Sequence, residues 1–412
     1  MRMPAVLLLF ALLPLPTFAA QKVGVDELRQ MLSALQTKSD RKTANRISEL
    51  HLTERLSRGE LDILSRSLPG PKSRTALLAV ADASAFQDPP AQEMLADAAP
   101  DAQMQREILM RAVQFANEQA DRVPNFVASR RVEHFEDVRV FPYSNKIEYY
   151  TPGSLRLLDH EAYDVHCSAG GDEVAEVPDR DLDRGASRQP QPLFYMTIWG
   201  YHTVWGNLTW DIPNVAPAGL KPTGAFGPWL QALTGDLPDA HYDWAYWESG
   251  GSGKLAVFRF RIDADSSHYT MEYDFESNKD NPFISHEDRK LIATPGYHGQ
   301  IAVDATTGQV ARIVVICDLA PGEGLSKASI ALEYGPMQMD GESYVLPVRG
   351  VSALSLRMDT HHYLFDSGML IGEQSDHFTV TSLDDFTVSD YRNYKPRIKI
   401  IPLKSLNAPQ VN

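Results

Sequence analysis

The spacing of hydrophobic residues changes near residue 123 and divides the chain into two parts. Before this point apolar residues recur three and four positions apart, which is the spacing of one helix face. In the first predicted helix these residues are Val25, Leu28, Met31, Leu32 and Leu35. After this point apolar and polar residues alternate, as in strands with one buried face. We therefore predict an α+β fold, with a helical region at 21–122 and an antiparallel β domain at 123–405.

The last helix of the first part is predicted from Gln103 to Arg122. Asp101 stands just before it, where a carboxylate can cap the first turn and faces the positive end of the helix dipole. The helical pattern gives way to alternation at Val123–Phe126, where we expect the first strand to begin.

The segment Gly299–Asp318 is typical of two strands joined by a tight turn at Asp304–Gly308. Residues 256–262 and 269–275 show the same alternation of apolar and polar positions. Successive strands of this kind predict one large antiparallel sheet, curved into a half-barrel or open barrel. We expect its concave side to carry Phe258, Phe260, Tyr269, Met271, Tyr273, Ile301 and Val303.

Two segments interrupt this pattern. Residues 168–192 contain paired glycines, alternating aspartate and arginine, and several prolines, which indicates a polar loop. Aromatic residues are dense between Trp199 and Trp247. They form either a wall that stacks on sugars or lines an apolar cavity, or the ordinary core of a large sheet. Trp244 and Trp247 are the candidates for ligand contact in this segment.

The first twenty residues have the pattern of a secretory signal peptide. Arg2 precedes an apolar run from Ala5 to Leu15, and small residues end the segment near Ala19 and Ala20. The apolar run is too short for a membrane span, and no later stretch is long enough. We therefore predict an exported protein, periplasmic or secreted, with no integral membrane segment once residues 1–20 are removed.

Charge narrows the choice of partners. The formal net charge of the chain is −15 at pH 7. Nucleic-acid binding requires a basic surface, so we do not expect a nucleic-acid partner. The composition also includes just two cysteines, Cys167 and Cys317. In an exported chain these permit one disulfide that closes a long loop, and the alternative is two separate buried thiols.

No pattern of catalytic or metal-binding residues is supported. The acidic loop Asp179–Gly185 departs from the calcium-binding spacing, because its glycine is one position late and its twelfth residue is proline. His361 and His362 are neighbours on a predicted strand, so their side chains point to opposite faces. Gly250–Gly253 is a hairpin turn and not the strand-to-helix elbow of a nucleophile. We predict no metal, cofactor or catalytic residue; enzymatic activity stays open, with a non-enzymatic role preferred.

Several segments together resemble an uncharacterised family of exported bacterial proteins. They include RVPNF at 122–126, FGPWLQAL at 226–233, VFRFRID at 257–263 and YGPMQMDGESYVLPV at 334–348. That family has no assigned activity, so the resemblance implies no catalytic residue.

The hairpin pattern GxIxVDxxTGxVxRI at 299–313 also resembles outer-membrane lipoprotein-sorting half-barrels of the LolA and LolB kind. This resemblance implies a curved antiparallel sheet closed by helices over an apolar cavity. The chain departs from it by carrying about a hundred helical residues in front of the sheet.

The leading hypothesis is an exported protein that binds an apolar or amphiphilic ligand, or the lipid tail of a partner, in a half-barrel. The candidate ligand-binding residues are Trp244, Trp247, Phe258, Phe260, Tyr269, Met271 and Tyr273. Two alternatives stay open. One is a protein-interaction module whose β scaffold is filled, and the other is a carbohydrate-binding protein that uses surface tryptophans.

Overall fold

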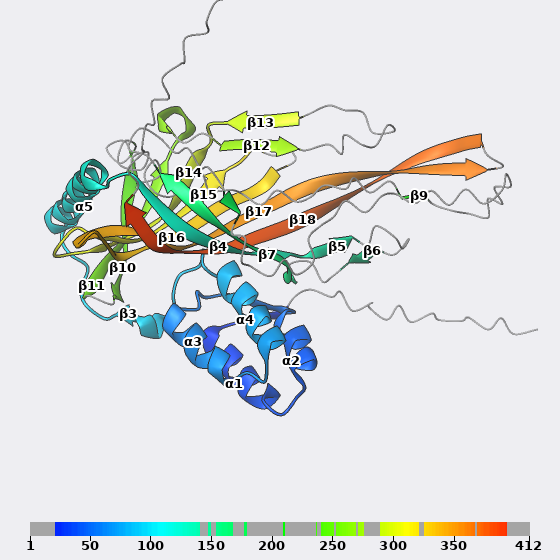
Figure 1. Cartoon of the computed structure of the whole chain (residues 1–412), viewed down its shortest axis with the longest axis horizontal. Helices are drawn as coiled ribbons and strands as arrows, with labels where there is room; N and C mark the ends of the chain where they lie inside the picture. The colour runs from blue at the N-terminus through cyan, green and yellow to red at the C-terminus, as the bar shows by residue number, and fades with distance from the viewer. Residues whose placement is uncertain are drawn as a thin grey trace, which may run out of the picture.

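The computed structural model describes residues 21–140, 147–149, 154–167, 177–178, 209–210, 236, 240–250, 253–268, 271–275, 289–320, 325–366 and 369–393. It confirms the predicted α+β class: helices precede residue 123, and a large antiparallel sheet follows it. Figure 1 shows the N-terminal helices packed together on one side of this twisted sheet, with the helix that precedes residue 123 at one end.

The first four helices form a compact unit. They are α1 (Val25–Leu35), α2 (Asp40–Ile47), α3 (Arg58–Ser67) and α4 (Pro71–Ala83), joined by the short parallel pair β1 (Gln21–Val23) and β2 (Leu50–Leu52). Their apolar positions meet in one core, as the helical spacing predicts. Asp40 of α2 caps α4, because its carboxylate accepts hydrogen bonds from the backbone N–H of Ser73 at 2.9 Å and of Lys72 at 3.1 Å.

Helix α5 (Ala102–Arg122) packs on the sheet and not on the other helices. It begins as predicted, since the Asp101 carboxylate accepts from the backbone N–H of Met104 at 2.8 Å. Its apolar side, including Ile108 and Ala112, joins the hydrophobic core of the sheet. The helical region at 21–122 therefore contributes to two separate cores.

The main sheet is antiparallel and open. Its strand order is β3, β10, β11, β14, β15, β16, β17, β18, β4, β7, β8, with β9 beside β17. These strands are β3 (Met94–Leu95), β4 (Phe126–Glu136), β7 (Arg156–Cys167), β8 (Val177–Pro178), β9 (Thr209–Trp210), β10 (His241–Ser249), β11 (Lys254–Ile262), β14 (Gly296–Asp304), β15 (Val310–Asp318), β16 (Leu325–Met339), β17 (Glu342–Asp366) and β18 (Met369–Asn393). The predicted hairpin at 299–318 is β14 and β15, paired through its length.

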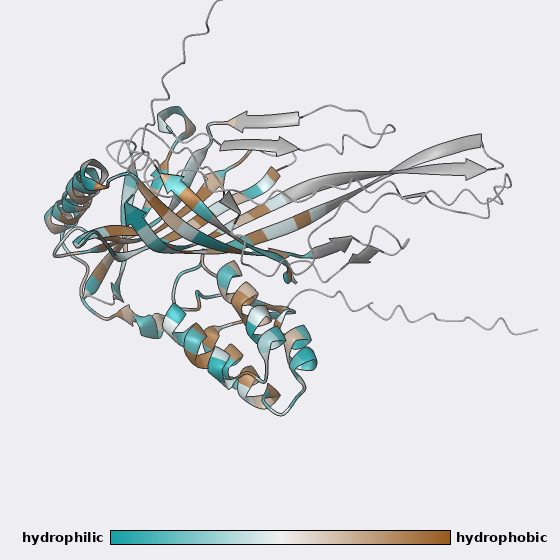
Figure 2. Ribbon diagram, viewed as in Figure 1, coloured by the Kyte–Doolittle hydropathy of each residue, from teal (hydrophilic) through white to brown (hydrophobic). Residues whose placement is uncertain are grey.

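The strand register defines two faces of the sheet. One carries Phe258, Ile301, Leu332 and Phe386 and contacts α5; we call it the α5 face. The other carries Val257, Ala302, Val351, Leu383 and Phe135. Helix α4 packs on this second face through Ala79, so we call it the α4 face. Figure 2 shows the alternation behind this division as bands of brown and teal along the strands.

The helical unit is fastened to the α4 face by buried ion pairs. Arg349 of β17 donates to Asp82 of α4 and, at 3.0 Å, to Asp385 of β18. Glu248 of β10 accepts from Arg55 of the helical unit and from Arg312 of β15. The sheet is therefore closed on this face by charged side chains that have specific partners.

The prediction that the strand with Met271 and Tyr273 belongs to the main sheet is wrong. Met271 and Tyr273 lie on β12 (Met271–Phe275), which pairs with β13 (Arg289–Ala293) in a separate two-stranded sheet. A further small pair is β5 (Val138–Val140) with β6 (Ile147–Tyr149). Strand β11 pairs instead with β14, whose residues are buried on both faces. In β12 the charged Glu272 and Asp274 alternate with the apolar Met271 and Tyr273. If β12 joined the main sheet with its apolar residues on the α5 face, these two charged residues would have to be buried on the α4 face.

Several predictions fall outside the described residues. They are the signal peptide at 1–20, Tyr269, the aromatic segment at 199–208 and most of the polar loop at 168–192, of which Val177–Pro178 forms β8. Within the described ranges, no helix has the length and hydrophobicity needed to cross a membrane.

Candidate ligand-binding face

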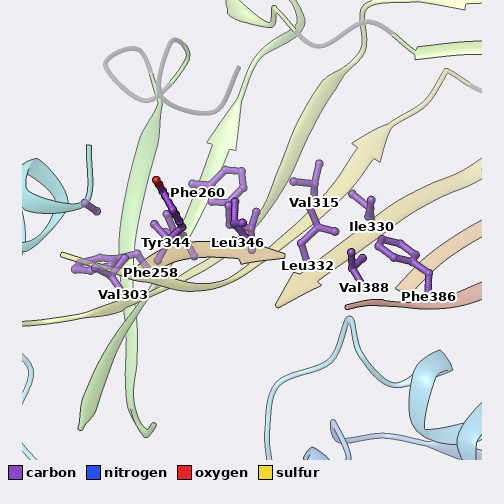
Figure 3. Packing of buried hydrophobic residues seen from close by; sticks show 14 of the residues in the cluster. Phe258, Phe260, Val303, Val315, Ile330, Leu332, Tyr344, Leu346, Phe386 and Val388 are labelled. Carbon is purple, nitrogen blue, oxygen red and sulfur yellow. The ribbon is translucent and has the colours of Figure 1, made fainter. Parts of the chain in front are cut away.

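The α5 face carries a continuous hydrophobic core that runs from β10 to β7. Phe258 and Phe260 of β11, Ile301 of β14 and Leu332 of β16 all belong to it and are almost fully buried. Figure 3 shows Phe258, Phe260, Val315, Ile330, Leu332 and Phe386 on the same side of the ribbon, away from the helical unit. The sequence therefore predicted the shared face of Phe258, Phe260, Ile301 and Val303 correctly.

This face depends on one close contact between neighbouring strands. Gly350 of β17 lies opposite Phe386 of β18. A Cβ atom at position 350 would come within 2.1 Å of the Phe386 ring, so glycine leaves the space in which this ring lies. Arg130 of β4 covers the ring, with its guanidinium carbon 4.2 Å from the ring centroid.

The two candidate tryptophans differ in their surroundings. Trp247 is 8% exposed, and its indole N–H donates to the Ala98 carbonyl at 2.9 Å. The Lys254 ammonium lies 3.7 Å from its ring centroid, and the Trp244 ring meets it edge-on at 4.9 Å. Trp244 is half-buried and also packs against Phe258. Because these neighbouring groups cover it, Trp247 does not offer the exposed ring that a sugar-stacking surface needs.

Helix α5 covers one part of the α5 face. It packs mainly on β14 and β15. Arg111 donates to the Ala305 carbonyl at 2.6 Å in the turn between these strands, and Gln119 contacts the backbone N–H of Val345. Gly308 has a positive φ of 78°, and a Cβ there would meet the Arg111 carbonyl at 2.5 Å. The turn and the helix therefore approach too closely for another residue.

A charged cluster lies on the α5 face at β4 and β18. The His134 imidazole contacts Asp384 through Nδ1 and Glu136 through Nε2, the latter at 3.1 Å. Burial alone would lower its pKa, but the two carboxylates outweigh burial and raise the pKa of His134 to about 9. With both ring nitrogens donating, this histidine is charged at neutral pH and has no free nitrogen to act as a base. The cluster therefore supports structure or polar recognition, not acid–base catalysis.

A second polar group lies at the other end of this face. Asp236 is completely buried and accepts from the Tyr297 hydroxyl at 2.7 Å and from the His268 backbone N–H at 3.0 Å. The Tyr242 hydroxyl on β10 is buried as well, and no described group lies within hydrogen-bond distance of it. Burial, followed by the negative charge of Asp236, raises the pKa of Tyr242.

The two cysteines are not joined by a disulfide. Cys167 ends β7 opposite Phe126, and Cys317 lies on β15 opposite Tyr297. In the strand order β7 is the fifth strand along from β15, so sheet pairing separates the two sulfur atoms. The disulfide that the sequence permitted is not formed, and the alternative of separate thiols holds. Burial raises the pKa of Cys317 to about 12, which makes it a poor nucleophile.

The sequence predicted hydrophobic residues of the α5 face but not the polar groups at its two ends. His134, Glu136 and Asp384 come from strands 250 positions apart in the chain, and Asp236 lies outside any recognisable motif. No signal in the sequence joins them, because strand pairing alone brings them together. In the described parts of the chain, no group of three or more histidine, cysteine, aspartate or glutamate side chains is arranged to hold a metal ion.

Comparison with known proteins adds one distant structural likeness. The chain is similar to a LolA superfamily protein from Nitrosomonas europaea, with a TM-score of 0.25 and 11% sequence identity, over 71% of this chain and 94% of that chain. A TM-score this low does not assign the chain to that superfamily. No protein-family model matches the sequence, and no curated protein matches it.

Proposed function

We propose that the protein binds an apolar or amphiphilic ligand on the α5 face. The observation behind this proposal is that the described helices and ion pairs cover the two faces of the sheet unequally. The α4 face is closed by α4 and by buried ion pairs, whereas α5 packs mainly on β14 and β15. The hydrophobic core extends well beyond those two strands, to Ile330 of β16, Phe386 of β18 and Val165 of β7. These side chains are themselves buried, so the proposal is that the apolar part of the ligand inserts between them, beyond the strands on which α5 mainly packs.

The edge of this surface supports the same proposal. Tyr242, Trp244, Met337 and Val132 pack against the core but are only partly buried, so they offer apolar atoms at its margin. At one end of the face the Tyr242 hydroxyl is buried and has no partner among the described residues. An amphiphile needs this combination, because its tail requires apolar contact and its head requires hydrogen bonds. Candidate contacts are Trp244, Phe258 and Phe260, while β12 keeps Met271 and Tyr273 on a separate strand pair.

The proposal also includes export. The signal-peptide pattern at 1–20 would deliver the protein across the membrane, where a soluble binder of apolar molecules has a clear use.

Two neighbouring valines make a matched test. Val315 and Val314 of β15 are both almost fully buried, but Val315 is in the core of the α5 face and Val314 points to the α4 face. Valine to threonine keeps the shape of the side chain and adds a buried hydroxyl, which costs about 1–3 kcal/mol at either site. We expect both variants to lose similar stability in urea. Only Val315→Thr should weaken binding of the neutral fluorescent probe N-phenyl-1-naphthylamine.

The parent protein decides the proposal. Saturable probe binding, together with a lipid or other apolar compound in organic extracts of natively purified protein, supports it. If the parent shows no saturable binding, or if Val314→Thr weakens binding as much as Val315→Thr does, the ligand does not occupy the α5 face.

A further inference from the structure

The end of the α5 face near β10 is built from three aromatic side chains on adjacent strands. Tyr242 of β10 lies opposite Phe260 of β11, and Tyr297 of β14 lies opposite Ile262. The Phe260 and Tyr297 rings meet edge-on with centroids 6.1 Å apart. Two tyrosine hydroxyls therefore come to one apolar end of the face, where each requires a hydrogen-bond partner or loses its hydration without compensation.

These two hydroxyls differ in their hydrogen-bond partners. Tyr297 donates to the Asp236 carboxylate at 2.7 Å. The same carboxylate also accepts from the backbone N–H and from the Nδ1 of His268, so its two oxygens are already engaged. The Tyr242 hydroxyl is buried and has no partner among the described residues. A buried hydroxyl of this kind destabilises the unliganded protein, because its lost bonds to water are not replaced.

The charges around this hydroxyl restrict what can bind it. Asp236 is a fully buried carboxylate on the same side of the sheet. Burial raises the pKa of Tyr242, and the negative charge of Asp236 raises it further. Arg259 and Arg261 of β11 alternate with Phe258 and Phe260 and therefore point to the opposite face. A ligand carboxylate or phosphate here would be repelled by Asp236 and would lose its hydration. An uncharged oxygen can accept from Tyr242 without either cost.

We infer that the Tyr242 hydroxyl donates a hydrogen bond to an uncharged oxygen in the head group of the ligand. The inference rests on the proposed function, and it narrows the ligand class to long-chain alcohols, esters and similar neutral amphiphiles. Fatty-acid anions are excluded from this class because Asp236 repels them, and alkyl ammonium ions are excluded because they have no lone pair to accept from Tyr242. The apolar chain lies along Phe260 and Phe258 towards the rest of the α5 face.

The test compares three head groups on one chain length. Delipidated full-length protein is loaded with N-phenyl-1-naphthylamine, which is then displaced by 1-dodecanol, dodecanoate or dodecylammonium. We expect 1-dodecanol to displace the probe at the lowest concentration. Tyr242→Phe should weaken 1-dodecanol binding about five- to tenfold, the value of one neutral hydrogen bond. It should leave probe binding unchanged and leave the urea midpoint of the unliganded protein unchanged or higher, which a structural hydroxyl would not do.

Tyr334→Phe is the matched control. Tyr334 of β16 packs against the same core, and its hydroxyl is likewise buried and without a partner in the described residues, but it lies farther along the sheet. This variant should bind 1-dodecanol as the parent does. The head-group inference is overturned if Tyr242→Phe leaves 1-dodecanol binding unchanged, if Tyr334→Phe weakens it instead, or if either charged amphiphile binds more tightly. If the parent does not bind the probe at all, the proposed function itself fails.

Discussion

Glu248 is held between two arginines where the helical unit meets the sheet. Arg312 donates to its Oε2 at 2.8 Å, and Arg55 donates to its Oε1. Burial acts to raise the pKa of Glu248, but the bonds and charges of Arg312 and Arg55 outweigh burial and hold it at about 2. The ionised carboxylate therefore favours the folded state, and protonation removes that contribution.

We predict that Glu248→Gln lowers the free energy of unfolding at pH 7 by about 3 kcal/mol, since it leaves two buried arginines without their carboxylate. The usual pKa of 4.5 lies above the folded value of about 2. The parent should therefore lose this stability as the pH falls from 4.5 to 2, while the variant shows a flatter profile there. Urea unfolding at several pH values measures both. Glu49→Gln, which breaks an exposed pair with Arg46, is the control and should change stability little.

His134 gives a pH dependence of the opposite sign. Its pKa of about 9 in the folded protein lies above the usual 6.5. The stability that charged His134 contributes is therefore fully present below pH 6.5 and is lost as the pH rises through 9. We predict that His134→Gln costs about 3 kcal/mol at pH 6 and that the difference from the parent shrinks by pH 9 and above. An NMR titration of the imidazole checks the pKa directly, and a value near 6.5 would contradict the prediction.

At the scale of elements, close approach between neighbouring strands shapes the α5 face. Strands β17 and β18 pair over most of their length, and Gly350 leaves room for Phe386 between them. The Phe386 ring is completely buried and belongs to the hydrophobic core of the α5 face. The packing of this pair therefore depends on a missing side chain in one strand.

We predict that Gly350→Ala lowers the free energy of unfolding by about 1–3 kcal/mol, because the added Cβ overlaps the Phe386 ring. Adding Phe386→Leu to Gly350→Ala should cost less than the sum of the two single changes, since the smaller side chain relieves the overlap. Gly59→Ala is the control: nothing lies within 4 Å of its Cβ position in α3, and alanine should stabilise that helix by up to about 1 kcal/mol. Strict additivity of the 350 and 386 changes would show that the ring is not what opposes a side chain at 350.

At the scale of the whole molecule, the sheet has two different partners. The helical unit closes the α4 face through the small cluster around Ala79 and Leu383 and through buried ion pairs. Helix α5 closes part of the α5 face from one end (Figure 1). This asymmetry is what makes the α5 face, and not the other, the candidate for a ligand.

Export is the prediction that concerns the whole chain. We expect protein recovered from its native host to lack residues 1–20, because Arg2, the apolar run and the small residues at the end match a cleaved signal peptide. Intact mass spectrometry of the protein from the fractionated host measures this. Full-length protein with Met1 present in the cytoplasmic fraction would contradict it, and with it the exported part of the proposed function.

The sequence by itself determined the change from helix to strand near residue 123 and the face of strands such as β11 and β14. Helical spacing in Val25–Leu35 and alternation in β11, β14 and β15 depend on residues a few positions apart, so they can be read locally. The same is true of the Asp101 cap and of the turn at Asp304–Gly308, which depend on short-range hydrogen bonds.

The tertiary structure alone decided which elements meet. Alternation does not say which strand lies beside which, so β12 was placed in the wrong sheet. It also does not say where a helix packs, and the structure alone places α5 in the core of the sheet. The polar ends of the α5 face, around His134 and Asp236, join residues far apart in the chain. Their partners are selected by strand pairing and by the cost of leaving a buried polar group unpaired, and neither is a property of a short stretch of sequence.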